Sequence, residues 1–239
     1  MEDAYSRYFP KLAAKKFAKY INIEHDQKLL PFRMRLLALI AACQAIGRQK
    51  ILKGLLRLAL ESDIDFKEIY EILLQGHLFI GYPKAIESFF TFNEALREFK
   101  EGGKSSRGDE ETTKYDLFET RGLTTAKRIY GKNFALVYDN IKNLCPDLAS
   151  GMIIEGYGRI ISRPDLDILA RELAVVAVLT VNSMPRQLYS HCRGSLNAGA
   201  SPDEVEAIIR QCGFFINPSK ISQALSILEK VLGNNADPR

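Results

Sequence analysis

The sequence predicts an all-α protein built from two tandem copies of one helical unit. The 239-residue chain matches itself without gaps at an offset of 136 residues, which indicates a repeated structural unit. Apolar residues recur at helical spacing in both copies, and no segment shows the alternation typical of a half-buried strand. We therefore expect a pseudo-twofold axis within the chain that relates residues 8–97 to residues 144–233.

The two copies share residues that shape helices and their ends. Identical pairs at the offset include Pro10/Pro146, Arg35/Arg171, Glu68/Glu204, Gln75/Gln211 and Lys84/Lys220. The segment EGGKSSRGDEETT at 101–113 is rich in Gly, Ser and charge, so we expect a flexible linker there. The predicted organisation is a first copy over 1–100, the linker, and a second copy over 114–239.

Helix signals are clearest in the second copy. Leu173, Val176 and Leu179 form the apolar stripe of a buried helix. The next helix should begin with Ser183 as its cap and with Pro185 in its first turn, and it should stop near Gly199. A further helix should begin with a capping box, in which Ser201 and Glu204 satisfy each other's free amides.

Composition excludes several classes of protein. The start, MEDAYSRYFPK, carries acids and lacks the apolar run of a secretory signal. The longest apolar runs, such as 173–181, are about half of the ~20 residues that a membrane span needs. The four cysteines include no CxxC pair and no zinc-like spacing, which favours reduced thiols. We therefore expect a cytoplasmic protein that binds no membrane, no metal and no cofactor.

Basic residues are concentrated near the N-terminus. Residues 1–57 hold twelve Lys and Arg against four Asp and Glu, and Lys11, Lys15 and Lys19 follow helical spacing. A solvated helix face explains this pattern better than a nucleic-acid site, because no stacking aromatics interleave with a known binding motif. Nucleic acid is therefore an unlikely partner.

Glu172 and His191 are the best candidates for chemistry. Each lies on the apolar side of its predicted helix, and two antiparallel helices joined by a short turn could bring them together. Imidazole titrates near neutrality, so a carboxylate–imidazole pair could pass protons at working pH. The alternative is a helix-capping glutamate and a satisfied core histidine. At the offset of 136, the first copy carries Leu36 and Leu55, so the scaffold itself needs neither polar group.

Leu144 to about Leu232 resembles the carboxymuconolactone decarboxylase family, which includes the alkyl hydroperoxidase D-like proteins. Glu119–Gly131 also resembles the entry to the decarboxylase branch. The motifs that carry this resemblance are CPDL at 145–148, YG at 157–158, SRPDLD at 162–167, RELA at 171–174, HCRGSLNAG at 191–199 and SPDE at 201–204.

The resemblance implies a compact helical bundle, usually a homo-oligomer, with sites between helices. Glu172 and His191 match the ends of the peroxidase motif, but its two cysteines fall on Met184 and Gln187. That departure disfavours a CxxC-dependent peroxidase. In the decarboxylase branch, the resemblance makes His191 the proton donor.

A small carboxylic acid substrate would also need a cationic anchor. The candidate anchors are Arg163, Arg171 and Arg193, any one of which could instead form a surface salt bridge.

Three functional hypotheses follow. The first is cofactor-free decarboxylation or proton transfer on a small carboxylated lactone or related acid, with His191 as acid and base and Glu172 as its orienter. The second is a thiol-dependent peroxidase that uses Cys192 or Cys212, although Cys192 diverges from His191 on the helix and cannot pair with it. The third is a non-catalytic helical binding module.

Overall fold

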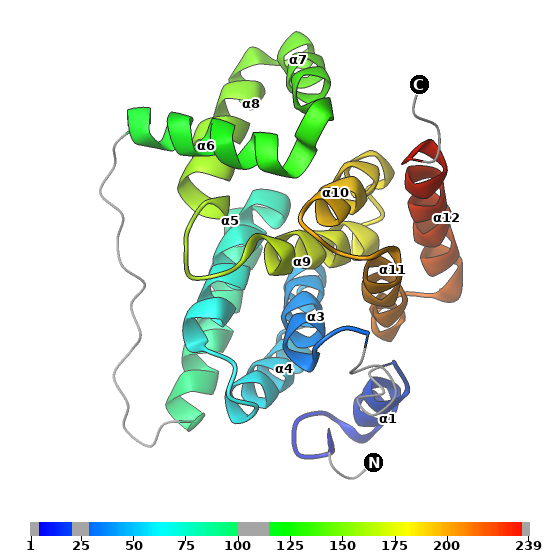
Figure 1. Ribbon diagram of the computed structural model, residues 1–239. Coiled ribbons are helices and arrows are strands. Elements are labelled where there is room, and N and C mark those ends of the chain that lie inside the picture. The colour runs from blue at the N-terminus through cyan, green and yellow to red at the C-terminus, as the bar shows by residue number, and fades with distance from the viewer. Residues whose placement is uncertain (1–4, 21–28, 100–114, 236–239) are drawn as a thin grey trace.

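The computed structural model describes residues 5–20, 29–99 and 115–235, and within these ranges it is helical with no strand (Figure 1). The predicted all-α class is therefore confirmed. The proposed linker at 101–113 lies outside the described residues.

The helices follow the two halves of the sequence. In the first half they are α1 (Lys11–Tyr20), α3 (Phe32–Ile46), α4 (Gln49–Glu61) and α5 (Phe66–Phe99). In the second half they are α6 (Tyr115–Tyr130), α7 (Phe134–Leu144), α8 (Pro146–Gly151), a π-helix (Met152–Ile161), α9 (Ile168–Val181), α10 (Pro185–Asn197), α11 (Pro202–Gln211) and α12 (Pro218–Asn235).

The offset of 136 residues also relates the helix boundaries. Helices α3 and α9 begin at 32 and 168, α4 and α10 at 49 and 185, and α5 and α11 at 66 and 202. Within α5 the backbone at Gly81 is not helical (φ 76°), so α5 consists of two helices joined at a kink. The second of these, from 82 to 99, corresponds at the same offset to α12.

Backbone details follow the same correspondence. Gly47 and Ser183 both have positive φ, as do Asp63 and Gly199, and each pair is separated by 136 residues. The halves also exchange hydrogen bonds: Gln75 Nε2 donates to the carbonyl of Arg171 at 3.1 Å, and Gln211 Nε2 donates to the carbonyl of Arg35 at 3.1 Å. Such reciprocity is what a twofold contact between related units produces. The axis itself stays a prediction.

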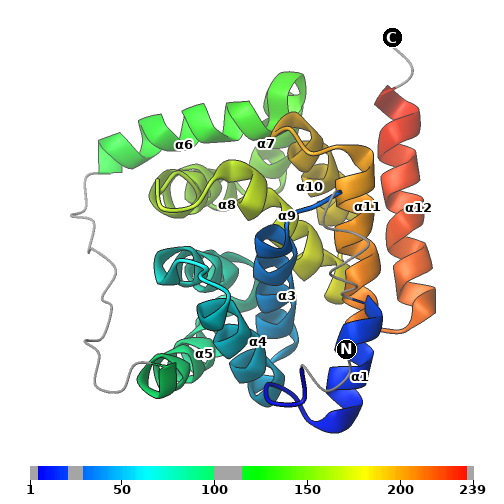
Figure 2. The ribbon, with the colours of Figure 1, turned by 60° about the horizontal axis from the view of Figure 1, so that its bottom comes forward.

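Helices α3 and α9 lie at the centre of the molecule, with α4, α10 and α11 around them (Figures 1 and 2). Residues 35–45 of α3 and 170–181 of α9 are all buried. A helix that is buried all round must be enclosed by others, which explains why both sequences lack a polar face. Buried side chains of both halves form one continuous core.

Helix α6 packs on the π-helix and forms a second, smaller core. Gly122 and Gly158 permit this close contact, because a Cβ at either position would lie 2.0 Å from a backbone carbonyl of the opposite helix. The π-helix was not predicted from the sequence. Its wider turn changes the direction in which side chains project, and π-helical turns often occur at functional sites.

The predicted helix signals were partly correct. Both hydrogen bonds of the Ser201–Glu204 capping box are present, and Pro185 opens α10 as expected. The prediction for Ser183 was wrong: Met184 occupies the cap position, and Ser183 adopts the left-handed backbone conformation that turns the chain between α9 and α10.

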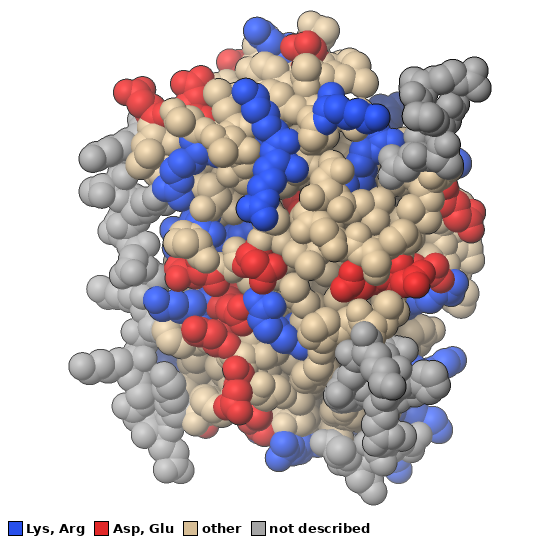
Figure 3. Space-filling view, in the orientation of Figure 1, with Lys and Arg blue, Asp and Glu red and all other residues tan. Residues whose placement is uncertain are grey.

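The surface carries patches of both charges on the face shown in Figure 3. Lys11, Lys15 and Lys19 are exposed on α1, in agreement with a solvated helix face. Within the described ranges, no helix is long and apolar enough to cross a membrane.

Candidate active site

A cavity of about 350 Å³ lies between the middle of α5, just before its kink, and α6, α8, the π-helix, α9 and α10. Its walls are largely apolar, with Phe79, Met152, Ile161 and Val175 among the lining residues. This volume falls within the range of sites that hold small molecules. The polar groups in its interior come from four residues: Tyr130, Tyr157, Glu172 and His191.

Glu172 and His191 meet in this cavity. The Nδ1 atom of His191 lies 2.9 Å from Oε2 of Glu172, and both side chains are buried. An ionised carboxylate only accepts hydrogen bonds, so the proton of the neutral imidazole is assigned to Nδ1. The lone pair is then on Nε2, where the ring can take or return a proton. The sequence prediction that these residues pair is supported by this geometry.

Gly194 leaves room for the carboxylate of Glu172. A Cβ at position 194 would lie 2.5 Å from Oε2 of Glu172 and 2.9 Å from Cγ2 of Ile129. At the offset of 136, the first half of the chain has Leu58, and it has Leu36 and Leu55 at the positions that match Glu172 and His191. All three residues of this group therefore correspond to leucine in the first half.

Tyr130 and Tyr157 form a hydroxyl pair beside the imidazole. The hydroxyl of Tyr157, on the π-helix, donates to that of Tyr130 at 2.6 Å. The rings of Tyr130 and His191 have centroids 6.5 Å apart. Burial raises the pKa of Tyr130 to about 12 and that of Tyr157 well above its usual value, and the nearby Glu172 charge adds to both shifts. Both phenols are therefore protonated near neutral pH.

The first half of the chain completes the cavity. Leu78 and Phe79 of α5 line it, and the ring of Phe79 meets that of His191 edge-on at a centroid distance of 5.8 Å. The first half has no equivalent acid–base pair, because Leu36 and Leu55 are fully buried at the matching positions. The site is thus asymmetric, with its ionisable pair on one half and an apolar wall from the other.

The three arginines predicted to anchor a carboxylate do not line this cavity. Arg171 is fully buried and donates to Oε2 of Glu71 at 2.8 Å, and Arg163 donates to Oε1 of the same carboxylate at 2.8 Å. Arg193 lies over the ring of Tyr189 and donates to its hydroxyl at 3.0 Å. The structure assigns Arg163 and Arg171 to holding α5 against α9, a role not predicted from the sequence.

The charged residues around the cavity are acidic. Asp147 and Glu155 line it near its opening, in addition to Glu172. Glu155 pairs with Arg159 at 3.1 Å on the exposed side of the π-helix. Of the described residues that line the cavity, none is Lys or Arg.

The cysteines that would serve a peroxidase are inaccessible. Cys192 and Cys212 are fully buried and do not line the cavity. Burial raises the pKa of Cys192 to about 12, with a further contribution from Glu172, and it raises the pKa of Cys212 as well. Because the thiolate is the reactive form, neither thiol is prepared for attack on a peroxide.

We expect a thiol reagent such as Ellman's reagent to react with the native protein at Cys145 alone, since Cys145 is partly exposed and the other three cysteines are buried. The absorbance of the thionitrobenzoate that is released should correspond to about one reactive thiol per chain in the native protein and to four after unfolding. Cys145→Ser should abolish the native reaction, whereas Cys192→Ser should leave it unchanged. A rapid reaction at Cys192 would restore the peroxidase hypothesis.

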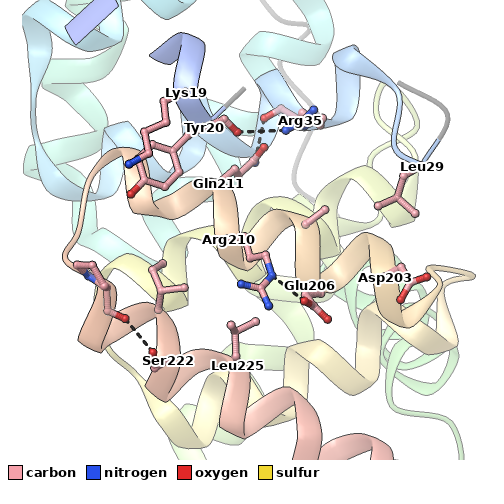
Figure 4. A pocket seen from close by; sticks show the side chains of 13 residues that line it. Lys19, Tyr20, Leu29, Arg35, Asp203, Glu206, Arg210, Gln211, Ser222 and Leu225 are labelled. Carbon is pink, nitrogen blue, oxygen red and sulfur yellow. Dashed lines mark hydrogen bonds and ion pairs between the residues drawn. The ribbon is translucent and has the colours of Figure 1, made fainter. Parts of the chain in front are cut away.

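A second cavity, of about 630 Å³, opens between α1, α11 and α12 (Figure 4). Arg35 and Gln211 reach it from the core, and the guanidinium of Arg35 donates to the carbonyl of Tyr20 at 3.3 Å. Arg210 pairs with Glu206 at its edge, at 2.6 Å. No histidine and no buried carboxylate is among the described residues that line it, so it lacks an acid–base pair.

Residues 146–230 match the carboxymuconolactone decarboxylase family. The matched segment contains α8 to α11 and most of α12, and therefore both members of the Glu172–His191 pair. This part of the chain is a carboxymuconolactone decarboxylase family domain. The resemblance of the sequence motifs is thereby confirmed.

Two relatives match different lengths of this chain. The 4-carboxymuconolactone decarboxylase of Acinetobacter baylyi is 25% identical over 112 residues, which cover 46% of this chain and 84% of the relative. Peroxisomal protein 2 of Schizosaccharomyces pombe is 25% identical over 186 residues, which cover 73% of this chain and 84% of the relative. The second match is longer than residues 114–239 and therefore extends into the first half.

Four residues of the site were missed from the sequence: Phe79, Tyr130 and Tyr157, which line the cavity, and Gly194, which leaves room for Glu172. A signal was present for three of them. Tyr130 and Tyr157 each precede a glycine in segments that resemble the family, and Gly194 replaces a leucine of the first copy just as Glu172 and His191 do. For Phe79 no signal was available, because its place in the wall depends on how the two halves pack.

Proposed function

We propose that the carboxymuconolactone decarboxylase domain catalyses cofactor-free proton transfer on a small molecule bound in the cavity of Glu172 and His191. The observation that carries this proposal is the 2.9 Å contact between Nδ1 of His191 and Oε2 of Glu172 in a largely apolar cavity. A histidine oriented by a carboxylate is a common general base.

In the proposed mechanism, Glu172 accepts the Nδ1 proton and fixes the ring, so Nε2 is the basic atom. When Nε2 takes a proton from the substrate, the imidazolium that forms is stabilised by the adjacent carboxylate. The same ring then returns the proton to carbon or to a leaving group. The cycle needs no oxidant, because the ring takes one proton and returns one. While the ring is an imidazolium, its Nε2 proton can exchange with solvent, so the proton that is returned can come from water.

Decarboxylation of a carboxylated lactone, as the name of the Acinetobacter relative states for that protein, is a narrower possibility. It requires a cation for the substrate carboxylate. Arg163, Arg171 and Arg193 are held by other partners outside the cavity. General proton transfer is therefore better supported than this particular reaction.

The test is deuterium uptake from D₂O into a panel of small ketones, keto acids and carboxylated lactones, followed by proton NMR. His191→Ala should slow uptake about 10²- to 10⁴-fold, the usual contribution of a positioned acid or base. The matched control is His77→Ala, since His77 does not line the cavity and contacts Tyr82 instead. Uptake or turnover that survives in His191→Ala would contradict the proposal.

A further inference from the structure

The buried polar groups of the cavity also indicate which class of substrate it accepts. Resting on the function proposed above, we infer that the substrate is an uncharged carbonyl compound with an acidic α C–H, and that Tyr130 donates a hydrogen bond to its carbonyl oxygen.

The charge of the lining disfavours an anionic substrate. Three carboxylates, those of Asp147, Glu155 and Glu172, line the cavity, and the described lining includes no cationic side chain other than a protonated His191. Glu172 is only 1% exposed, so water screens its charge poorly. A substrate carboxylate would enter without a partner and beside like charge, which is costly in a buried site. An uncharged molecule meets the apolar walls without this penalty.

The tyrosine pair leaves one hydroxyl proton directed away from the pair. Tyr157 donates to the oxygen of Tyr130, and no acceptor for the Tyr130 proton lies within hydrogen-bonding distance among the residues described. Tyr130 lines the cavity and is 6% exposed. Its proton is therefore available to a ligand, and the hydrogen bond from Tyr157 strengthens Tyr130 as a donor.

The base and the donor line the same cavity. The ring centroids of His191 and Tyr130 are 6.5 Å apart, at an interplanar angle of 57°. A carbonyl group with its α-carbon can reach both, with the C–H toward Nε2 and the oxygen toward the Tyr130 hydroxyl. Buried phenols that donate to a developing oxyanion are a recurrent means of stabilising an enolate.

The proton balance of the step is complete. Nε2 takes the α-proton, the C–H electron pair forms a carbon–carbon double bond, and the carbonyl π pair moves to oxygen. The resulting negative charge lies against the Tyr130 hydroxyl, and the positive charge of the imidazolium lies against Glu172. Return of a proton from Nε2 to carbon restores the carbonyl compound. In D₂O the Nε2 proton of the imidazolium exchanges with solvent before the return, so the atom returned to carbon is deuterium.

The test uses two ketones with the same carbon skeleton around the ketone, the uncharged ester methyl levulinate and the anion levulinate. Deuterium uptake next to the ketone is followed by proton NMR with wild-type protein, Tyr130→Phe and Tyr138→Phe. Tyr138 is the matched control, because it stacks on Phe134 and does not line the cavity. We expect wild type to exchange methyl levulinate at least about tenfold faster than levulinate, in proportion to the cost of an unpaired charge.

Tyr130→Phe should slow exchange of methyl levulinate about 100-fold, as loss of an oxyanion donor does, and Tyr138→Phe should not. Saturation-transfer NMR should still detect methyl levulinate on Tyr130→Phe, which shows that the cavity persists.

Full activity in Tyr130→Phe overturns the donor role. If the wild type instead exchanges levulinate faster, and His191→Ala loses this exchange, the substrate is not uncharged, but the proposed proton transfer still holds. If the wild type exchanges neither ketone, this inference is overturned. The proposed function is not, because the keto acids and lactones of the earlier panel still test it.

Discussion

Replacing Glu172 and His191 together by leucine should abolish deuterium uptake and leave the free energy of unfolding unchanged or higher. The double variant gives the second half the residues that the first half has at Leu36 and Leu55, where leucine is fully buried. Replacing both partners of a buried hydrogen bond by apolar groups of similar shape can be nearly neutral or stabilising.

The single variants should behave differently. Glu172→Leu leaves the Nδ1 proton of His191 without its acceptor, and His191→Leu leaves the carboxylate buried without its donor. An unpaired buried polar group costs about 1–3 kcal/mol, and more when it is charged. Urea denaturation of all four proteins gives the coupling energy. If the double variant were less stable than either single variant, the pair would be a structural element and not a site retained for function.

Glu71→Ala should lower the free energy of unfolding by about 3–5 kcal/mol, the usual cost of removing one partner of a buried ion pair. Glu71 is 1% exposed and accepts from Arg171 and Arg163, both at 2.8 Å. Burial already lowers the pKa of Arg171, and the bond to Glu71 opposes that shift. Without the carboxylate, the guanidinium of Arg171 stays in the core with carbonyl oxygens as its only acceptors.

The matched control is Glu206→Ala. Glu206 also pairs with an arginine, Arg210, at 2.6 Å, but both side chains are largely exposed. Its loss should cost less than about 1 kcal/mol. The two variants are compared by urea denaturation at one pH. Equal, small effects would show that Glu71 does not hold the halves together.

Much of the fold could be predicted from the sequence because its signals are local. Proline at helix starts, glycine at helix ends and the Ser201–Glu204 box act within a few residues, so helix boundaries were readable. The offset of 136 then gave the correspondence of the halves. The cap predicted at Ser183 was wrong because its side chain suits a cap, whereas the turn requires its backbone to be left-handed.

The site was predictable only where it depends on one helix hairpin. Glu172 and His191 lie on adjacent helices, so their pairing followed from spacing along the chain. The role of the arginines did not, because Glu71 lies 100 positions from Arg171 in sequence and meets it only after the halves pack. The π-helix that carries Tyr157 packs against α6, and no period in the sequence indicated it.

The asymmetry of the cavity bears on why two units would share one polypeptide. When two identical chains associate, every substitution appears on both sides of the axis, and a histidine on one wall dictates a histidine on the other. Covalent linkage removes that constraint. Phe79 of one half can face His191 of the other, and each half can vary independently while Gln75 and Gln211 preserve the contact between them.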